Sequence, residues 1–185
     1  MKPLVVYYSL TGNTEFIAQN IAAETGADIM ELKPFAQRVG SMLFPLKCFL
    51  QVLLRQKPRI RSFERNPNSY DFIFIGTPVW AGSFAPAVRS MLQKIDVREK
   101  KVAVFCCHSG RIGRAMDDLK ELLYCSDIEG EKSFYRPLTF EKARNAGIAR
   151  AWAGEMIARA VAVAPLEESR EGTFAGRNLG RCVNF

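Results

Sequence analysis

The chain has 185 residues, 48% of them hydrophobic, and carries a formal net charge of +7 from 26 Lys and Arg against 19 Asp and Glu. This length and apolar content favour one compact domain with a substantial core over two domains. The positive charge favours anionic partners without choosing among nucleotide, acidic protein, anionic lipid and nucleic acid. No secretory signal or apolar run of roughly 18 residues is present, so we expect a cytoplasmic protein with no transmembrane segment.

Apolar runs and helical patterns alternate along the chain. The predicted strands are residues 4–8, 27–32, 72–75, 102–106 and 133–138, and the predicted helices are residues 14–24, 85–95, 113–123 and 143–163. Three of the strand runs lack polar alternation, as parallel strands buried on both faces do. Such alternation gives right-handed crossovers and a parallel sheet with helices on both faces, and ligands bind at the carboxyl ends of its strands.

Two segments lie outside this alternation. Residues 41–55 form a strongly apolar helical stretch broken near Pro45, and a basic segment follows. Its cations could bind an NADPH phosphate, an acidic protein or a membrane surface, or form a solvated face; they are Arg55, Lys57, Arg59, Arg61 and Arg65. Residues 165–185 are rich in Gly, Arg and Asn, and we expect an irregular basic tail there.

The loop after the first strand has the composition of a phosphate site. Hydroxyls come from Ser9, Thr11 and Thr14, Gly12 permits close backbone approach, and the next helix directs free N–H groups at an anion. The loop has neither the Walker A spacing nor the GxGxxG of dinucleotide folds, so a monophosphate fits better. Taken alone, the loop is equally well explained as an ordinary helix cap, a role open to Asn13.

The loops after the third and fourth strands supply further candidates. The second loop, residues 76–83, presents Trp80 where a planar ring can stack, although Trp80 could instead pack on the 41–55 helix. The third loop contains the only His of the chain, His108, followed by Arg111. Either residue is a candidate catalytic group, or else an ordinary exposed loop residue. The five cysteines lack CxxC spacing, so we expect no metal site.

These loops resemble those of the flavodoxin family. Ser9-Leu10-Thr11-Gly12-Asn13-Thr14 looks like the flavodoxin loop for the FMN phosphate, and Thr77-Pro78-Val79-Trp80 resembles its second flavin loop. The resemblance implies a three-layer α/β sandwich with a five-stranded parallel sheet of order 2-1-3-4-5 and FMN at the switch point, flavodoxin being a standard example of that order. It implies an FMN-binding domain over residues 1–164 and a tail over residues 165–185.

The resemblance also assigns the cofactor residues. The implied FMN-binding residues are Ser9, Thr11, Gly12, Asn13, Thr14, Thr77, Pro78, Val79, Trp80, Ala81, Gly82, His108, Ser109, Gly110, Arg111 and Gly113. The third loop has no Tyr to stack on the second flavin face and resembles the Ser-Gly loop of flavodoxin-like oxidoreductases. Carrier flavodoxins are also typically acidic, whereas this chain is basic.

We therefore interpret the chain as an FMN-dependent oxidoreductase that passes electrons from NAD(P)H to a small acceptor such as a quinone. The alternative is a flavodoxin-type electron-transfer protein serving redox partner proteins. A third hypothesis is a binding domain without flavin. Nothing resembles a nucleic-acid platform of aromatic and basic residues, so we expect no nucleic-acid partner. The sequence carries no signal for the oligomeric state.

Overall fold

The computed structural model describes residues 1–35, 44–98 and 100–168. Its strands are β1 (Pro3–Tyr7), β2 (Asp28–Glu31), β3 (Phe72–Trp80), β4 (Ser83–Phe84), β5 (Lys101–His108) and β6 (Asp127–Tyr135). Its helices are α1 (Asn13–Thr25), α2 (Phe44–Leu53), α3 (Pro86–Leu92), α4 (Ala115–Leu122) and α5 (Lys142–Glu168), with a short 3-10 helix at Pro67–Ser69.

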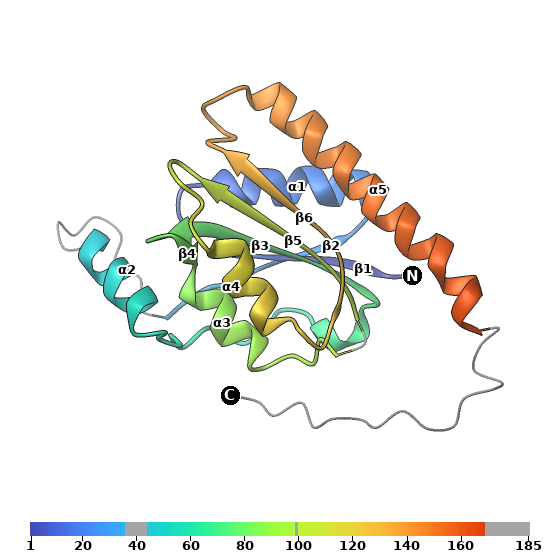
Figure 1. Cartoon of the computed structure of the whole chain (residues 1–185), viewed down its shortest axis with the longest axis horizontal. Coiled ribbons are helices and arrows are strands. Elements are labelled where there is room, and N and C mark those ends of the chain that lie inside the picture. Colours follow the sequence, from blue (N-terminus) through green and yellow to red (C-terminus); the bar gives the residue numbers. More distant parts are fainter. Residues whose placement is uncertain (36–43, 99, 169–185) are drawn as a thin grey trace.

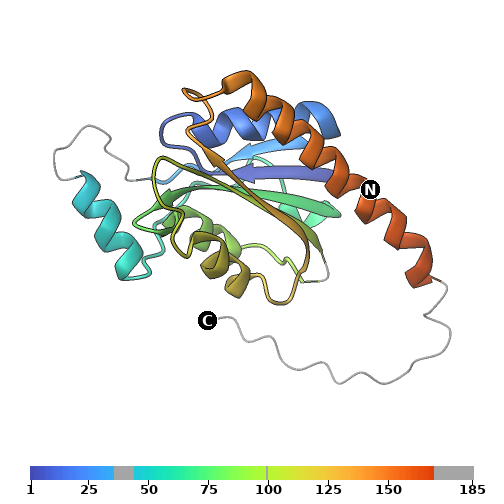
Figure 2. The same cartoon turned by 45° about the horizontal axis from the view of Figure 1, so that its top comes forward.

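The sheet has the strand order β2-β1-β3-β5-β6, with every pair along this path parallel. Helices α1 and α5 cover one face of the sheet, and α3 and α4 cover the other (Figure 1). The turned view in Figure 2 shows the same three layers. Counting only the parallel strands, this is the order 2-1-3-4-5, so the predicted flavodoxin-like α/β fold is confirmed.

One hydrophobic core lies on each face of the sheet, because alternate strand residues point to opposite faces. Val6, Ile75 and Cys106 belong to the core under α3 and α4, and Val5 and Cys107 belong to the core under α1 and α5. Burial raises the pKa of the Cys106 thiol to about 12. These adjacent thiols are therefore packing groups that stay protonated at neutral pH.

Several strand and helix boundaries differ from the predicted ones, most clearly those of β3, β6 and α5. Strand β3 continues to Trp80, because Thr77 and Pro78 still pair with β5 and the chain then turns back into β4. Strand β6 begins at Asp127, six residues before the predicted start. It is an edge strand with polar residues along much of its length. Without an apolar run, its first residues gave no strand signal in the sequence.

Helix α5 continues to Glu168, so the first four residues assigned to the tail are helical. Residues 169–185 of the predicted tail and residues 41–43 of the predicted helix 41–55 lie outside the described residues. Helix α2 begins at Phe44, immediately before Pro45, a residue that is well tolerated in the first turn of a helix. Among the described helices, none has the length and apolar content to cross a bilayer.

Candidate functional site

The loop from Ser9 to Thr14 connects β1 to α1 at the carboxyl end of the sheet. Gly12 precedes the first turn of α1 with a φ of 81°, and a Cβ added to it would lie 3.1 Å from Leu138 Cδ1. The positive φ favours glycine there, and the Leu138 side chain leaves little room for a larger residue. No side chain caps α1, so its first N–H groups remain available to an anion.

Two hydroxyls of this loop are buried without a hydrogen-bond partner. In the described part of the chain, three buried side-chain oxygens lack such a partner, and they are those of Ser9, Thr14 and Ser126. Thr14 is 1% exposed and lies beside the Cys107 thiol. Burial raises the pKa of that thiol, and the neighbouring Thr14 hydroxyl acts in the opposite direction. An unpaired buried hydroxyl is costly. A phosphate at the α1 terminus would provide the missing acceptor for Ser9 and Thr14, so the residues present fit the FMN phosphate.

Asn13 and Thr11 shape the loop. The Asn13 side-chain amide donates to Thr11 Oγ1 at 2.9 Å, and its oxygen accepts the backbone N–H of Leu138 at 3.1 Å. Asn13 thus ties the loop to the segment after β6, more than 120 residues later. This fourth segment was not predicted, since no motif in the sequence marks Leu138 as a neighbour of Gly12.

The second predicted loop is a hairpin. Trp80 pairs with Ser83, and the two residues between them, Ala81 and Gly82, have φ angles of 48° and 76°. Positive φ at both central residues is the requirement of a type I′ turn, whose twist matches that of the strands. The Thr77 hydroxyl is fully buried and accepts from Ala85 N at 2.9 Å. Thr77 therefore stabilises the hairpin. Within the predicted Thr77–Trp80 loop, the half-buried Trp80 is the remaining candidate for contact with a flavin ring.

The strained position of Ala81 gives a stability prediction. Alanine at positive φ is unfavourable, so we expect Ala81→Gly to raise the free energy of unfolding by about 0.5–1 kcal/mol. As a matched control, Ala151→Gly changes an exposed residue inside α5 and should lower it by about 1 kcal/mol. Urea unfolding of both variants measures the two effects. Equal losses in both would show that Ala81 is unstrained.

The third loop packs directly against this hairpin. Gly113 has a φ of 59°, and a Cβ on it would lie 2.4 Å from the carbonyl oxygen of Gly82. The Arg114 N–H donates to that same oxygen at 2.7 Å. The predicted cofactor residues Gly82 and Gly113 therefore join two loops to each other. Ser109, Gly110 and Arg111 form the exposed part of the third loop.

His108 ends β5 and lies in an aromatic group. Its ring Nδ1 lies 2.6 Å from the Gly110 carbonyl oxygen, which fixes the ring over the third loop. The ring centroid is 5.6 Å from that of Tyr135, whose ring is 5.7 Å from Phe140. Tyr135 is the register partner of His108 in β6. The sequence analysis did not single out Tyr135 or Phe140, although Tyr135 lies within the predicted strand 133–138, because their place beside His108 depends on how β5 and β6 pair.

Trp80, the last residue of β3, lies next to the residue that follows β1. Its ring contacts the buried Tyr8 ring edge to face, with centroids 5.5 Å apart. Burial, with Cys48 and Glu31 nearby, raises the pKa of the Tyr8 hydroxyl. Tyr8 therefore stays neutral at physiological pH and supports Trp80 by packing.

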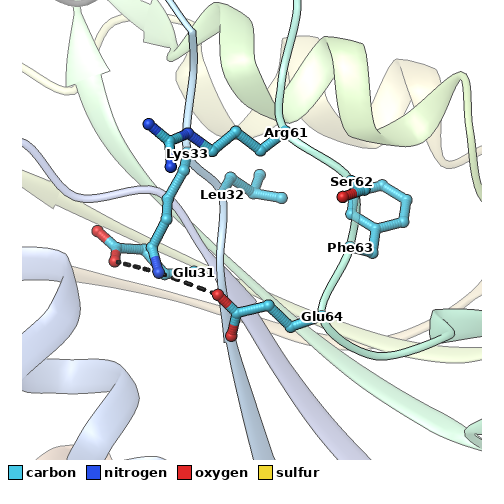
Figure 3. Close-up of a pocket in the computed structure, with 7 residues that line it drawn as sticks. All are labelled: Glu31, Leu32, Lys33, Arg61, Ser62, Phe63 and Glu64. Carbon is cyan, nitrogen blue, oxygen red and sulfur yellow. Dashed lines mark hydrogen bonds and ion pairs between the residues drawn. The ribbon is translucent and has the colours of Figure 1, made fainter.

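A polar cavity of about 210 Å³ lies beside the carboxyl end of β2 (Figure 3). Its lining residues are Glu31, Leu32, Lys33, Arg61, Ser62, Phe63 and Glu64. Figure 3 shows the Lys33 ammonium between two carboxylates, 3.9 Å from Glu31 Oε2 and 3.0 Å from Glu64 Oε1. Since Lys33 is already paired, it is a poor anchor for a phosphate.

A second cavity of about 610 Å³, lined in part by Tyr70 and Lys100, lies at the amino ends of the strands. Neither cavity is lined by the Ser9–Thr14 loop. Ligands of this kind of sheet bind at the carboxyl ends of its strands, so the second cavity is not the flavin site. Within the described residues, no group of three or more His, Cys, Asp or Glu is arranged to hold a metal ion.

The comparison with known proteins identifies the family of this chain. The family model "Flavodoxin" matches residues 2–135, which include the phosphate loop, the hairpin and the third loop. The chain belongs to the flavodoxin family. Flavodoxins bind FMN at the β1/β3 switch point, so family membership and the fit of the loop both give FMN as the cofactor.

Individual proteins similar to this chain include a curated flavodoxin and solved flavoproteins of the same fold. A flavodoxin from Haemophilus influenzae is 28% identical over 105 residues, which are 55% of this chain and 47% of that protein. This chain thus matches about half the length of that curated relative. A candidate flavoprotein from Bacteroides eggerthii has a TM-score of 0.70 at 22% identity, covering 84% of this chain and 98% of its own. A Lactobacillus acidophilus flavoprotein solved in complex with FMN has a TM-score of 0.63 at 23% identity, covering 76% and 97%.

Proposed function

We propose that this flavodoxin-family protein is an electron-transfer flavoprotein, which exchanges electrons with redox partner proteins through FMN at the carboxyl edge of the sheet. The observation that carries the proposal is the phosphate cradle, in which the uncapped end of α1 faces the buried, unpaired hydroxyls of Ser9 and Thr14. FMN supplies one- and two-electron chemistry, and the protein supplies position, electrostatics and access.

The residues around the cradle have distinct roles in this proposal. Trp80 flanks one side of the ring, held by its contact with Tyr8. On the other side, His108 is held by the Gly110 carbonyl and Arg111 projects from the exposed third loop, where its positive charge favours electron uptake by the flavin.

Protein partners fit the surface beside the third loop. Tyr135 and Phe140 are 42% and 51% exposed and adjoin His108. Exposed aromatic residues are enriched at protein interfaces. Together with the match to flavodoxins, this surface favours the electron-transfer alternative over the NAD(P)H oxidoreductase that the sequence suggested.

The oxidoreductase remains a second candidate because of one observation. The exposed tip of the third loop, Ser109 to Arg111, contains no aromatic ring that would cover the second flavin face. An uncovered face is open to a small acceptor such as a quinone and to a nicotinamide donor.

Anaerobic reduction of the purified FMN-loaded protein separates the two candidates. For a carrier, we expect NADH and NADPH to bleach the flavin band no faster than they bleach free FMN. Dithionite should reduce the same protein fully, and the reduced protein should then pass its electrons to ferricyanide. Steady oxidation of NADH or NADPH in the presence of a quinone would contradict the carrier and establish the oxidoreductase.

A further inference from the structure

The positive charge of the chain is concentrated in one segment. Residues 32–63 contain seven Lys and Arg and no Asp or Glu, and the rest of the chain has 19 basic against 19 acidic residues. The whole net charge of +7 therefore arises from these 32 residues. A segment with one sign of charge attracts an anionic surface strongly and over a distance.

Helix α2, in the middle of this segment, presents its apolar residues outward. Leu46, Phe49, Leu50 and Leu53 recur at spacings of three and four, so they lie along one side of the helix, and we call them the α2 stripe. They are between 42% and 63% exposed. Val52, on a different side of the helix, is half-buried. Surface helices usually point such a stripe inward. Within residues 1–35, 44–98 and 100–168, nothing apolar covers the α2 stripe.

Basic residues follow the α2 stripe along the chain. Arg55 and Arg59 follow α2 and are exposed. Burial, and after it the nearby Arg55 charge, lower the pKa of Arg89. The Arg89 guanidinium lies 4.8 Å from the ring centroid of Phe84 in β4. Positive charge therefore extends from the end of α2 toward α3 and β4. The sequence grouped Arg65 with these cations, but Arg65 forms an ion pair with Asp28 at 3.2 Å and is partly neutralised.

We propose that α2 and the basic residues after it bind the surface of an anionic lipid bilayer. The helix would lie in the interface with the α2 stripe among the acyl chains and Arg55 and Arg59 at the lipid phosphates. A helix of Leu and Phe flanked by cations is the usual composition of such an interfacial segment.

Other occupants fit these observations less well. A symmetric contact with a second copy would bring two segments of like charge together. A nucleic acid would use the cations and leave the leucines exposed. The anchors of protein interfaces are enriched in Trp, Tyr and Arg, and Leu is under-represented among them, whereas Leu forms most of the α2 stripe.

The location of α2 has a consequence for electron transfer. In both views α2 lies beyond the end of the sheet toward which the arrowheads of β3 and β5 point (Figures 1 and 2). A bilayer bound to α2 would therefore be close to the edge that carries the FMN loops. This consequence rests on the proposed function, whereas the binding itself does not depend on FMN.

Sedimentation of the full-length protein with vesicles tests the proposal. We expect the protein to bind vesicles of phosphatidylcholine that contain about one third phosphatidylglycerol, and to bind pure phosphatidylcholine at least tenfold more weakly. Phe49→Gln with Leu53→Gln should weaken binding to the anionic vesicles about tenfold or more, because two inserted side chains become polar. Arg55→Glu with Arg59→Glu should weaken it similarly and remove most of its salt dependence.

Matched controls change the same kinds of residue elsewhere. Tyr124→Gln with Val161→Gln alters two exposed apolar side chains outside α2, and Lys94→Glu reverses an exposed cation outside residues 32–63. Both controls should bind like the original protein. The side chains at all of these positions are exposed, so folding should be unaffected, which circular dichroism can verify.

Three outcomes would overturn the proposal. The first is an absence of vesicle binding. The second is binding that survives the loss of Phe49 and Leu53, which would show general attraction of charge. The third is a concentration-dependent dimer that the Phe49 and Leu53 replacements abolish while vesicle binding stays weak. None of them would affect the FMN proposal, because FMN binding and reduction are measured without lipid.

Discussion

Replacing Thr14 by Val, or Ser9 by Ala, is expected to weaken FMN binding about 10- to 100-fold, because each change removes a hydrogen bond to a charged phosphate. The same changes should leave the apoprotein as stable as before or slightly more stable. Both hydroxyls are buried and unpaired in the protein itself, so their removal relieves a desolvation penalty. Fluorescence titration with FMN and urea unfolding of the apoprotein measure the two quantities.

Ser126 provides the matched control for these variants. Its hydroxyl is also buried without a partner, but it lies just before β6 begins, at the opposite edge of the sheet from the phosphate loop. Ser126→Ala should therefore show the same small stability effect and an unchanged affinity for FMN. If Ser9→Ala and Thr14→Val also bind FMN with unchanged affinity, the phosphate does not lie in this loop.

Gly113→Ala is expected to give the largest loss of stability, about 3 kcal/mol in the free energy of unfolding. The new Cβ would lie within 2.4 Å of the Gly82 carbonyl oxygen, and the φ of 59° is strained for any residue with a side chain. Backbone atoms cannot move aside as the end of a flexible side chain can. The hairpin and third loop would separate, so FMN affinity should fall as well.

Gly110→Ala is the control from the same loop. A Cβ at Gly110 would meet nothing within 4 Å, so this variant should change the free energy of unfolding by less than about 0.5 kcal/mol. Urea unfolding of the two variants measures the difference. A similar stability for both would contradict the close contact between Gly82 and Gly113.

The parts of the site that come from one continuous segment were predictable from the sequence. The Ser9–Thr14 loop has its chemistry in its own residue types, and its position between a buried strand and a helix follows from local periodicity. The same is true of Trp80 and His108 at the ends of their strands. Wrong boundaries arose where polar residues concealed a strand, as in β6, and where the end of β3 was taken for a loop.

The contacts between distant segments were not predictable in this way. Leu138 against Gly12, Tyr135 beside His108, and Gly82 against Gly113 each depend on how strands and loops are placed in the sheet. The sequence analysis assigned Thr77 to FMN binding, whereas its hydroxyl stabilises the hairpin in the structure. That hairpin exists only because β4 pairs with β3.

The sequence by itself determined the alternation of strands and helices, the hydroxyl and glycine content of the Ser9–Thr14 loop and the charge asymmetry of residues 32–63, because each is a property of residue types in order along the chain. Only the tertiary structure decided which hydroxyls are left unpaired and which side of α2 faces outward. Both depend on what packs against a residue from elsewhere in the chain. The buried hydroxyls carry the proposed FMN site, and the exposed α2 stripe carries the proposed contact with a lipid surface.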